Sequence, residues 1–485
     1  MTAEAPAPGP AYWCEHAHVD GRVRHGVLVE TSADGRIAAV RTGVGAPPPV
    51  AEPLRGLTLP GLANAHSHAF HRALRGTAQL GSGTFWTWRE TMYRAAERLT
   101  PDAYFALARA VYAEMALAGI TCVGEFHYVH HAPGGERYAD PNAMGDALVA
   151  AAADAGIRIT LLDTAYLSGG FAPSGEHAPP DARQARFSDG TGEAWAERAA
   201  ALHDGLAGAP HARAGAAVHS VRAVPARELG TVAAWAGQRS APLHVHLSEQ
   251  PAENEACARA YGVTPARLLA DHGVLGPRTT AVHATHLTDA DIRLLGGSGT
   301  GVCMCPTTER DLADGIGPAP ALAAAGSPLC LGSDSHAVLD LWEEARAMEL
   351  NERLRSRTRG HWTAQQLLCA ATEHGHAALG WPEAGSLEPG RLADFTTVAL
   401  DSVRTAGPAA ELGAETAVFA ATAADVRHTV VGGRHVVRDG AHRTVPDAAR
   451  ELAAAVAELT GARNPDPDRD RDGDRAPTEQ EDTRR

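Results

Sequence analysis

Long apolar runs are absent from this chain of 485 residues, and none approaches the ~20 residues that a helix needs to cross a bilayer. The first ten residues also lack the basic and apolar regions of a secretory signal. We therefore expect a cytoplasmic protein without a signal peptide and without a membrane partner.

Cysteine and positive charge are also scarce. The seven cysteines include no Cys-x-x-Cys pair, and their odd number favours reduced thiols over a disulfide framework. The net charge of −15 argues against nucleic acid as a partner. It leaves room for a cationic pocket that binds a small anionic substrate.

Strand patterns occupy both ends of the chain. They cover residues 11–14, 26–30 and 36–41 near the start, and 393–400, 426–431 and 434–438 near the end. We expect one small β-sandwich domain assembled from residues 1–58 and 389–445. A helix is predicted over 446–462, and the charged segment 463–485 is expected to be disordered.

The middle of the chain, residues 59–388, alternates apolar runs with helical stretches. One helix should begin after Thr100 as its cap, with Pro101 in its first turn, and end at Gly119. Eight such units predict a (β/α)8 barrel, because doubly wound sheets rarely reach eight strands with this regularity. The expected strands are 59–66, 120–126, 157–164, 213–219, 242–248, 279–284, 300–305 and 328–333.

The first of these strands ends in His66-Ser67-His68. Side chains two residues apart share a face of a strand, so both imidazoles can reach one point and form half of a metal site. In a barrel, functional groups gather at the carboxyl ends of the strands, and ionisable residues stand at almost every such end here. A metal would supply the partner that these buried polar groups need.

The histidines and acids resemble the pattern of the amidohydrolase superfamily, in its cytosine-deaminase-like branch with a single metal. The matching positions are Pro60-Gly61, His66, His68, His246-Leu-Ser-Glu249, His283 and Asp334. Five further stretches resemble the formimidoylglutamate deiminases of that branch. They are His66–Phe70, Phe85–Glu90, Glu125–His131, His219–Ala223 and Cys305–Glu309.

This resemblance implies that one divalent cation, Zn²⁺ or alternatively Fe²⁺, is held by His66, His68, His246 and Asp334. His244 shares a face with His246 but lies one layer deeper, and we interpret it as structural. No lysine that could be carboxylated to bridge two ions stands at a strand end, which disfavours a second metal.

Catalysis is assigned by the same resemblance. Glu249 would shuttle a proton from the activated water to the leaving nitrogen, and His283 and Asp334 would orient and deprotonate the water. Glu249 could instead be a solvated carboxylate at the start of a helix. On the sixth strand His286 competes with His283, which is preferred because it falls on the apolar run.

Substrate recognition should require forked cations, because formimidoylglutamate carries two carboxylates. Arg89 and Arg222 follow the family motifs, and Tyr128 and His219 could add hydrogen bonds. His71 departs from the glutamine that we expect in many relatives, and it could still donate a hydrogen bond to the substrate. Glu125 and the pair His130-His131 have no assigned role.

The leading hypothesis from the sequence is a deaminase that converts N-formimidoyl-L-glutamate to N-formyl-L-glutamate in histidine degradation, as a homodimer. The alternative is a sister deaminase or chlorohydrolase that acts on an aromatic heterocycle such as guanine, which predicts an aromatic wall in place of Arg89 and Arg222. A non-catalytic scaffold is disfavoured because all four ligand positions and Glu249 are present.

Overall fold

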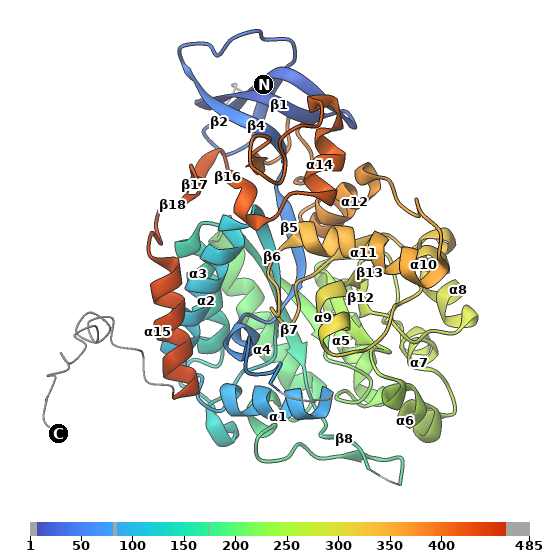
Figure 1. Cartoon of the computed structure of the whole chain (residues 1–485). Helices are drawn as coiled ribbons and strands as arrows, with labels where there is room; N and C mark the ends of the chain where they lie inside the picture. Colours follow the sequence, from blue (N-terminus) through green and yellow to red (C-terminus); the bar gives the residue numbers. More distant parts are fainter. Residues whose placement is uncertain (1–6, 81–84, 173, 462–485) are drawn as a thin grey trace, which may run out of the picture.

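Two large sheets organise the chain in the computed structural model, which describes residues 7–80, 85–172 and 174–461 (Figure 1). One sheet is assembled from both ends of the chain and lies at one end of the molecule. The other is parallel, is surrounded by helices, and forms the body of the protein. The predicted tail 463–485 lies outside the described residues.

The parallel sheet has eight strands in the order β14-β13-β12-β11-β10-β7-β6-β5. A bridge between Ser67 and Asp334 joins its two edges, so the sheet is nearly closed and the predicted (β/α)8 barrel is confirmed. The strands are β5 (Leu62–Ser67), β6 (Ile120–His127), β7 (Arg158–Ala165), β10 (Ala212–Val218), β11 (Leu243–Leu247), β12 (Thr279–His283), β13 (Gly301–Met304) and β14 (Leu329–Leu331).

Each predicted barrel strand has a counterpart whose ends lie within one or two residues, except the first. The run 59–66 is divided between two sheets, because β4 ends at Pro60 and β5 begins at Leu62. Gly61 makes this junction possible: a side chain there would meet Thr121 at 2.3 Å. One chain segment thus passes directly from the terminal sheet into the barrel.

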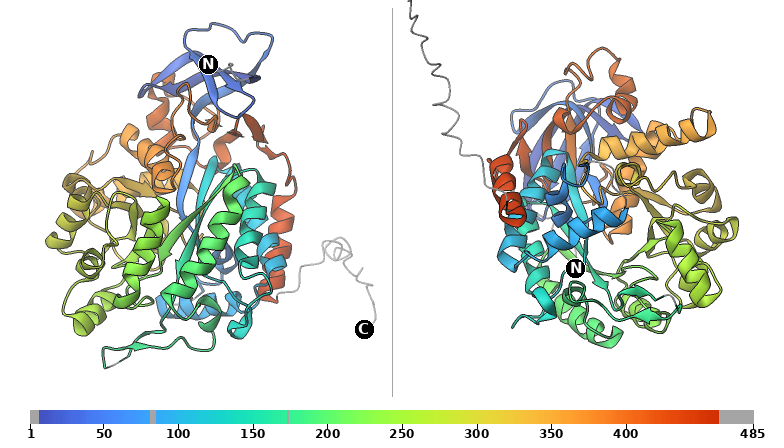
Figure 2. Two further views of the ribbon diagram at one scale, coloured as in Figure 1. Left: turned by 180° about the vertical axis from the view of Figure 1, so that it is seen from behind. Right: turned by 60° about the horizontal axis from the view of Figure 1, so that its bottom comes forward.

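Helices cover the outside of the barrel (Figure 2). In α2, Thr100 Oγ accepts the Ala103 amide and Pro101 stands in the first turn, as predicted. The helices of this layer are α1 (Phe85–Ala96), α2 (Pro101–Leu117), α3 (Ala143–Ala155), α4 (Gly192–Gly205), α5 (Ala226–Arg239), α6 (Pro251–Tyr261), α7 (Pro265–Asp271), α8 (Asp289–Ser298), α9 (Pro306–Asp311), α10 (Ala319–Ala325), α11 (Leu341–Ser356), α12 (Ala364–Ala371) and α13 (Glu373–Ala378).

The terminal sheet has the order β18-β17-β16-β15-β4-β1-β2-β3, so strands from the two ends meet between β4 and β15. Its strands are β1 (Pro8–Val19), β2 (Arg22–Ser32), β3 (Ile37–Arg41), β4 (Ala51–Pro60), β15 (Phe395–Val398), β16 (Val426–Val431), β17 (Arg434–Arg438) and β18 (Ala441–His442). The helices α14 (Gly413–Phe419) and α15 (Ala448–Thr460) follow, and α15 packs on α2.

The early strands are longer than the sequence suggested, because β1 and β2 pair along nearly their whole length. β4 was not predicted, since Pro53 and Gly56 resemble breaks in a strand. Gly56 has φ 106°, and a side chain there would lie 2.2 Å from Val398 O. This glycine therefore permits the close approach of β4 and β15.

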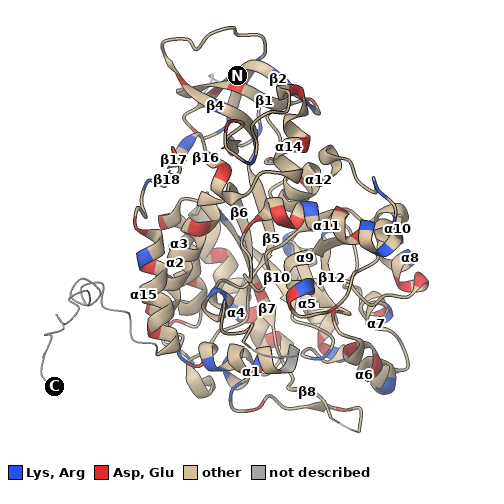
Figure 3. Ribbon diagram, in the orientation of Figure 1, with Lys and Arg blue, Asp and Glu red and all other residues tan. Residues whose placement is uncertain are grey.

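A buried ion pair links the two sheets. Arg158, at the start of β7, donates from Nε and Nη2 to Asp394 at 2.6 and 3.0 Å, and Asp394 also accepts the Gly432 amide. Charged residues of both signs are interspersed along the outer helices (Figure 3). Within the described residues, no helix is long and apolar enough to cross a membrane.

Candidate metal centre and active site

The carboxyl ends of the barrel strands bring the predicted ligands together. His66 lies near the end of β5, His246 in β11 and His283 at the end of β12, while Asp334 follows β14. The barrel closes at the same place, because the Asp334 amide donates to His66 O at 3.0 Å. His66 and Asp334 therefore stand on the seam between the first and last strands, and His246 and His283 join them from β11 and β12.

The backbone at these strand ends is strained. Ser248, His283, Ala284, Asp334 and His336 have φ between 43° and 67°, the left-handed region that residues other than glycine rarely adopt. Such residues cluster where the surrounding structure holds a side chain in a required direction. Here the left-handed turns direct His283 and Asp334 toward the barrel axis.

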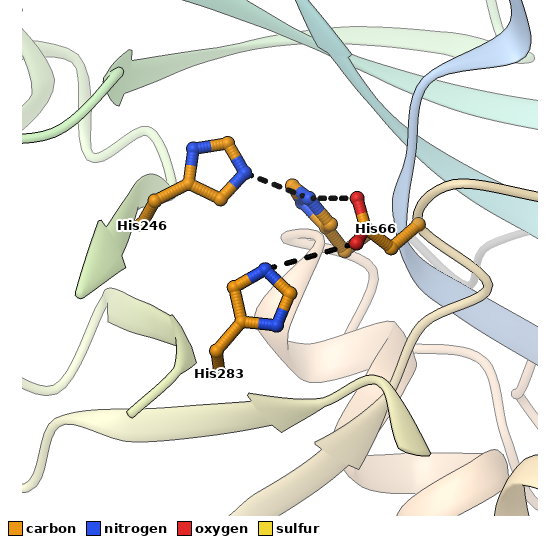
Figure 4. A group of neighbouring side chains, drawn as sticks. His66, His246 and His283 are labelled. Carbon is orange, nitrogen blue, oxygen red and sulfur yellow. Dashed lines mark hydrogen bonds and ion pairs between the residues drawn. The ribbon is translucent and has the colours of Figure 1, made fainter. Parts of the chain in front are cut away.

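The donor atoms form a compact, buried group. His66 Nε2 lies 3.2 Å from Asp334 Oδ1 and 3.1 Å from His246 Nε2, and His283 Nε2 lies 3.7 Å from Asp334 Oδ2. Figure 4 shows His66, His246 and His283 pointing toward one another. His68 Nε2 lies 3.4 Å from the same Asp334 Oδ1.

Hydrogen bonds behind two of the rings determine which nitrogen faces the group. His246 Nδ1 donates to His219 O at 2.8 Å and His68 Nδ1 to Phe126 O at 3.0 Å, because a carbonyl can only accept. His68 Nε2 therefore presents a lone pair to Asp334 Oδ1, and His246 Nε2 presents one to His66 Nε2. A proton on His66 Nε2 could satisfy only one of these acceptors, so the donor set fits a divalent cation such as Zn²⁺.

His283 lies among carboxylates. Its Nε2 is 3.8 Å from Glu249 Oε1, and its Nδ1 is 3.5 Å from Glu309 Oε1. Burial disfavours the charged ring, but Glu249, Glu309 and Asp334 raise the pKa of His283 to about 10. Burial and the Asp334 charge raise the pKa of Glu249 to about 6, although His283 opposes this. Glu249 can thus bind and release a proton near neutral pH.

A buried chain of hydrogen bonds supports the turn that carries His66 and His68. The Glu125 carboxylate accepts the Ser67 hydroxyl at 2.9 Å and the Ala69 amide at 2.7 Å, so it holds the residues on both sides of His68. Ser67 Oγ also lies 2.9 Å from His336 Nε2. This Glu125–Ser67–His336 chain connects the ends of β5, β6 and β14. Three of the predicted ligands, His66, His68 and Asp334, lie at the ends of β5 and β14.

A pocket opens directly above the donor group. All five predicted substrate-binding residues line it, together with Glu249, His283 and Asp334. The structure adds residues that the sequence reasoning did not assign to the site, and each lines the pocket: Trp88, Met92, Tyr93, Tyr166, Phe187 and Leu312. Tyr166 follows the end of β7, so a survey of every strand end would have found it.

The two arginines of the pocket are held differently. Arg222 Nε donates to Glu253 Oε2 at 2.9 Å, and Glu253 Oε1 accepts the Ser248 amide next to Glu249. Arg89 Nη2 lies 3.5 Å from Tyr166 Oη, and its guanidinium stacks over the Tyr93 ring at 5.2 Å. The pocket therefore combines forked cations with aromatic rings.

His71 is buried beside His68, with 4.5 Å between the ring centroids. Its Nε2 lies 3.1 Å from Tyr128 Oη. Burial lowers the pKa of His71 to about 3, so the ring is neutral and one nitrogen keeps a lone pair.

The remaining candidates lie outside the donor group. His244 Nε2 donates to Ala378 O at 2.9 Å, as expected for a structural residue, and His286 does not line the pocket. His130 donates to Thr164 O, and His131 pairs with Asp189, which is held by Arg198. These contacts place His130 and His131 in a buried network beside the pocket.

Comparison with known proteins decides the family. A model of the amidohydrolase family matches residues 57–436. This chain belongs to the amidohydrolase family. It is accordingly a hydrolase that acts on C–N bonds, and the predicted resemblance is confirmed. The family is metal-dependent, in agreement with the donor set.

Several relatives are deaminases. The chain is 40% identical over 395 residues to a formimidoylglutamate deiminase of Pseudomonas aeruginosa, covering 79% of this chain and 85% of that protein. It is 32% identical over 390 residues to an 8-oxoguanine deaminase of the same organism, covering 79% and 83%.

A crystal structure of an amidohydrolase from Brucella melitensis is 33% identical, covers 93% of this chain and all of that one, and superimposes with a TM-score of 0.85. An atrazine chlorohydrolase from Arthrobacter aurescens, complexed with zinc, covers 93% of this chain at a TM-score of 0.80. Its 24% identity supports a shared fold alone.

The Glu125 chain yields a test. Glu125→Ala leaves the Ser67 hydroxyl and the Ala69 amide without their buried acceptor, so we expect metal affinity to fall about 10- to 100-fold. Zinc retained during dialysis against graded chelator concentrations measures this change. Glu97→Ala, at an exposed position, is the control. If folded Glu125→Ala binds zinc as tightly as the unchanged protein, the turn that carries His66 and His68 does not depend on Glu125.

Proposed function

We propose that this protein is a metal-dependent deaminase that hydrolyses N-formimidoyl-L-glutamate to N-formyl-L-glutamate and ammonia, a step of histidine degradation. The observation that carries the proposal is one pocket that joins a donor group for a divalent cation to the guanidiniums of Arg89 and Arg222. The 40% identity to a formimidoylglutamate deiminase supports the same substrate.

The metal is assigned to His66, His68, His246 and Asp334, with Zn²⁺ preferred for its nitrogen and oxygen ligands. When bound, such a cation supplies Lewis acidity, which lowers the pKa of water. Glu249 accepts a proton from the attacking water and delivers it to the amidine nitrogen. A C–O bond forms at the formimidoyl carbon, and the proton of the resulting hydroxyl group follows the first one through Glu249 to the terminal nitrogen. The bond from the carbon to that nitrogen breaks, ammonia leaves, and the bond to the glutamate nitrogen stays intact.

His283 and Asp334 hold the water for this attack. Their side chains converge on the Glu249 side of the pocket, with His283 Nε2 lying 3.8 Å from Glu249 Oε1 and 3.7 Å from Asp334 Oδ2. Glu309, on the other side of the His283 ring, fixes its orientation through Nδ1. Glu249 can return its proton because its pKa, raised to about 6, lies close to neutral pH.

Substrate binding rests on charge. Arg222 has its Nε engaged by Glu253, so its two Nη groups form a fork that matches a carboxylate. Arg89 is assigned the second carboxylate. Tyr128, His219 and His71 also line the pocket and are assigned hydrogen bonds to the formimidoyl group.

A second candidate is deamination of an aromatic heterocycle. Tyr93, Tyr128, Tyr166 and Phe187 line the pocket and could stack on a planar ring. The identity of 32% to an 8-oxoguanine deaminase points in the same direction. The homodimer and the cytoplasmic location expected from the sequence stay predictions.

Ammonia release decides between the two substrates. Zinc-loaded protein is offered N-formimidoyl-L-glutamate, guanine and 8-oxoguanine, and metal content is measured on the same sample. We expect turnover of the formimidoyl compound and little of the purines, because the arginines provide counter-charges for two carboxylates. Metal-loaded protein that leaves N-formimidoyl-L-glutamate intact would refute the proposal.

Replacing Glu249 tests the proton shuttle. Glu249→Gln should bind metal as the unchanged protein does but lose kcat by about 10²- to 10⁴-fold, since an amide cannot carry the proton. Steady-state kinetics and metal analysis on one preparation measure both effects. Glu255→Gln, on the exposed side of α6, is the matched control. An active Glu249→Gln enzyme would remove Glu249 from the mechanism.

Arg222 is tested through KM. Arg222→Ala should raise KM for N-formimidoyl-L-glutamate about 10- to 100-fold, because a charge-assisted hydrogen bond to a carboxylate is lost. The single variant also leaves Glu253 buried without its cation. The double variant Arg222→Ala/Glu253→Gln removes that complication, and an unchanged KM in both would contradict carboxylate binding at Arg222.

A further inference from the structure

A buried glutamine lies behind the aromatic side of the pocket. Gln184 directly precedes the 3₁₀ turn η3 (Ala185–Phe187), is 4% exposed, and is not among the described residues that line the pocket. Its Nε2 donates to Tyr166 Oη at 2.9 Å and to Tyr93 Oη at 3.1 Å. Gln184 therefore joins a side chain of α1 to one that follows β7.

The orientation of this amide is determined by its other contacts. Gln184 Oε1 accepts the Asp181 amide at 2.9 Å, and Nε2 also lies 3.5 Å from the carbonyl oxygen of Gly169. Because a backbone amide can only donate and a carbonyl can only accept, the NH₂ group of Gln184 must face the two phenols. Gln184 is thus a donor toward both tyrosines.

The same two tyrosines hold the guanidinium of Arg89. Tyr166 Oη lies 3.5 Å from Arg89 Nη2, and Arg89 Cζ lies 5.2 Å from the centroid of the Tyr93 ring. An arginine side chain loses rotamer entropy when it binds a carboxylate, and a guanidinium that is already held loses less. Fixing the two rings therefore favours carboxylate binding at Arg89.

The hydroxyl groups of the two tyrosines can also take part in binding. Burial raises the pKa of Tyr93 above its usual value, so this phenol keeps its proton near neutral pH. Tyr93 and Tyr166 each accept a hydrogen bond from Gln184, which leaves their own protons for other acceptors. Both residues line the pocket, where a carboxylate at Arg89 is such an acceptor.

We propose that Gln184 is a positioning residue, which fixes Arg89 for carboxylate binding through the hydroxyl groups of Tyr93 and Tyr166. The inference rests on the proposed function, in which Arg89 binds one of the two substrate carboxylates. Because Gln184 acts from behind the pocket wall, its loss should weaken substrate binding and leave the chemical step at Glu249 unchanged.

Substitution of Gln184 should separate KM from kcat. Gln184→Met has a similar length but no donor, so we expect KM for N-formimidoyl-L-glutamate to rise about 10-fold, the effect of one lost hydrogen bond, while kcat stays within about twofold. Steady-state kinetics on zinc-loaded, full-length protein measure both constants. Tyr166→Phe, which removes one of the two hydroxyls, should raise KM similarly if methionine disturbs folding. Gln238→Met, at an exposed position of α5, is the matched control.

A glutamine that only stabilises the fold would act independently of Arg89. We therefore expect Gln184→Met to raise KM in the unchanged protein but to add nothing in the Arg89→Ala background, because the residue through which it acts is missing. Additive effects of the two substitutions would overturn the proposal. So would an unchanged KM in folded Gln184→Met and Tyr166→Phe.

A binding measurement keeps this inference separate from the proposed function. N-formyl-L-glutamate carries the same two carboxylates, and calorimetry measures its Kd for zinc-loaded protein without turnover. Gln184→Met should weaken this binding about 10-fold. Equal Kd values, or no binding by the unchanged protein, would overturn the inference. A protein that leaves N-formimidoyl-L-glutamate intact but shows this loss of affinity would refute the proposed activity and support the role of Gln184.

Discussion

Mutual repulsion of buried acceptors is the constraint on which this site depends. His246 and His68 each donate one ring proton to a backbone carbonyl, so His68 directs a lone pair at the ionised Asp334 carboxylate and His246 directs one at His66 Nε2. Burial raises the pKa of a carboxyl, but hydrogen bonding from His66 and the nearby imidazole charges lower the pKa of Asp334 well below its usual range. A cation at the centre relieves this repulsion. The hydrogen bonds that orient the rings therefore favour metal binding, and a bound metal in turn stabilises these ring orientations.

The residues that close the barrel also carry part of the metal site. Ser67 and Asp334 pair across the seam between the first and last strands, and the residues on either side of Ser67 are the first two ligand candidates. Glu125 then secures the same turn from the neighbouring strand. A change that loosens the seam should therefore weaken metal binding.

Periodicity and strand ends made most of the architecture predictable. Alternating apolar runs and helices identified the eight barrel strands, and the parallel arrangement then required their carboxyl ends to share one edge. This is why His66, His246, His283 and Asp334, which are far apart in sequence, could be grouped in advance. β4 was missed because Pro53 and Gly56 look like strand breaks, although Gly56 is what allows β15 to approach.

By itself, the sequence determined the fold class, the family and the residue types that gather at the strand ends, because these follow from short-range patterns and a fixed strand direction. The tertiary structure decided which atoms meet. Met92 and Phe187 line the pocket from α1 and from the 3₁₀ turn Ala185–Phe187, which lie away from the ends of the barrel strands. The convergence of His66, His68 and His283 on the Asp334 carboxylate depends on left-handed turns and ring orientations, which only the packed protein can set.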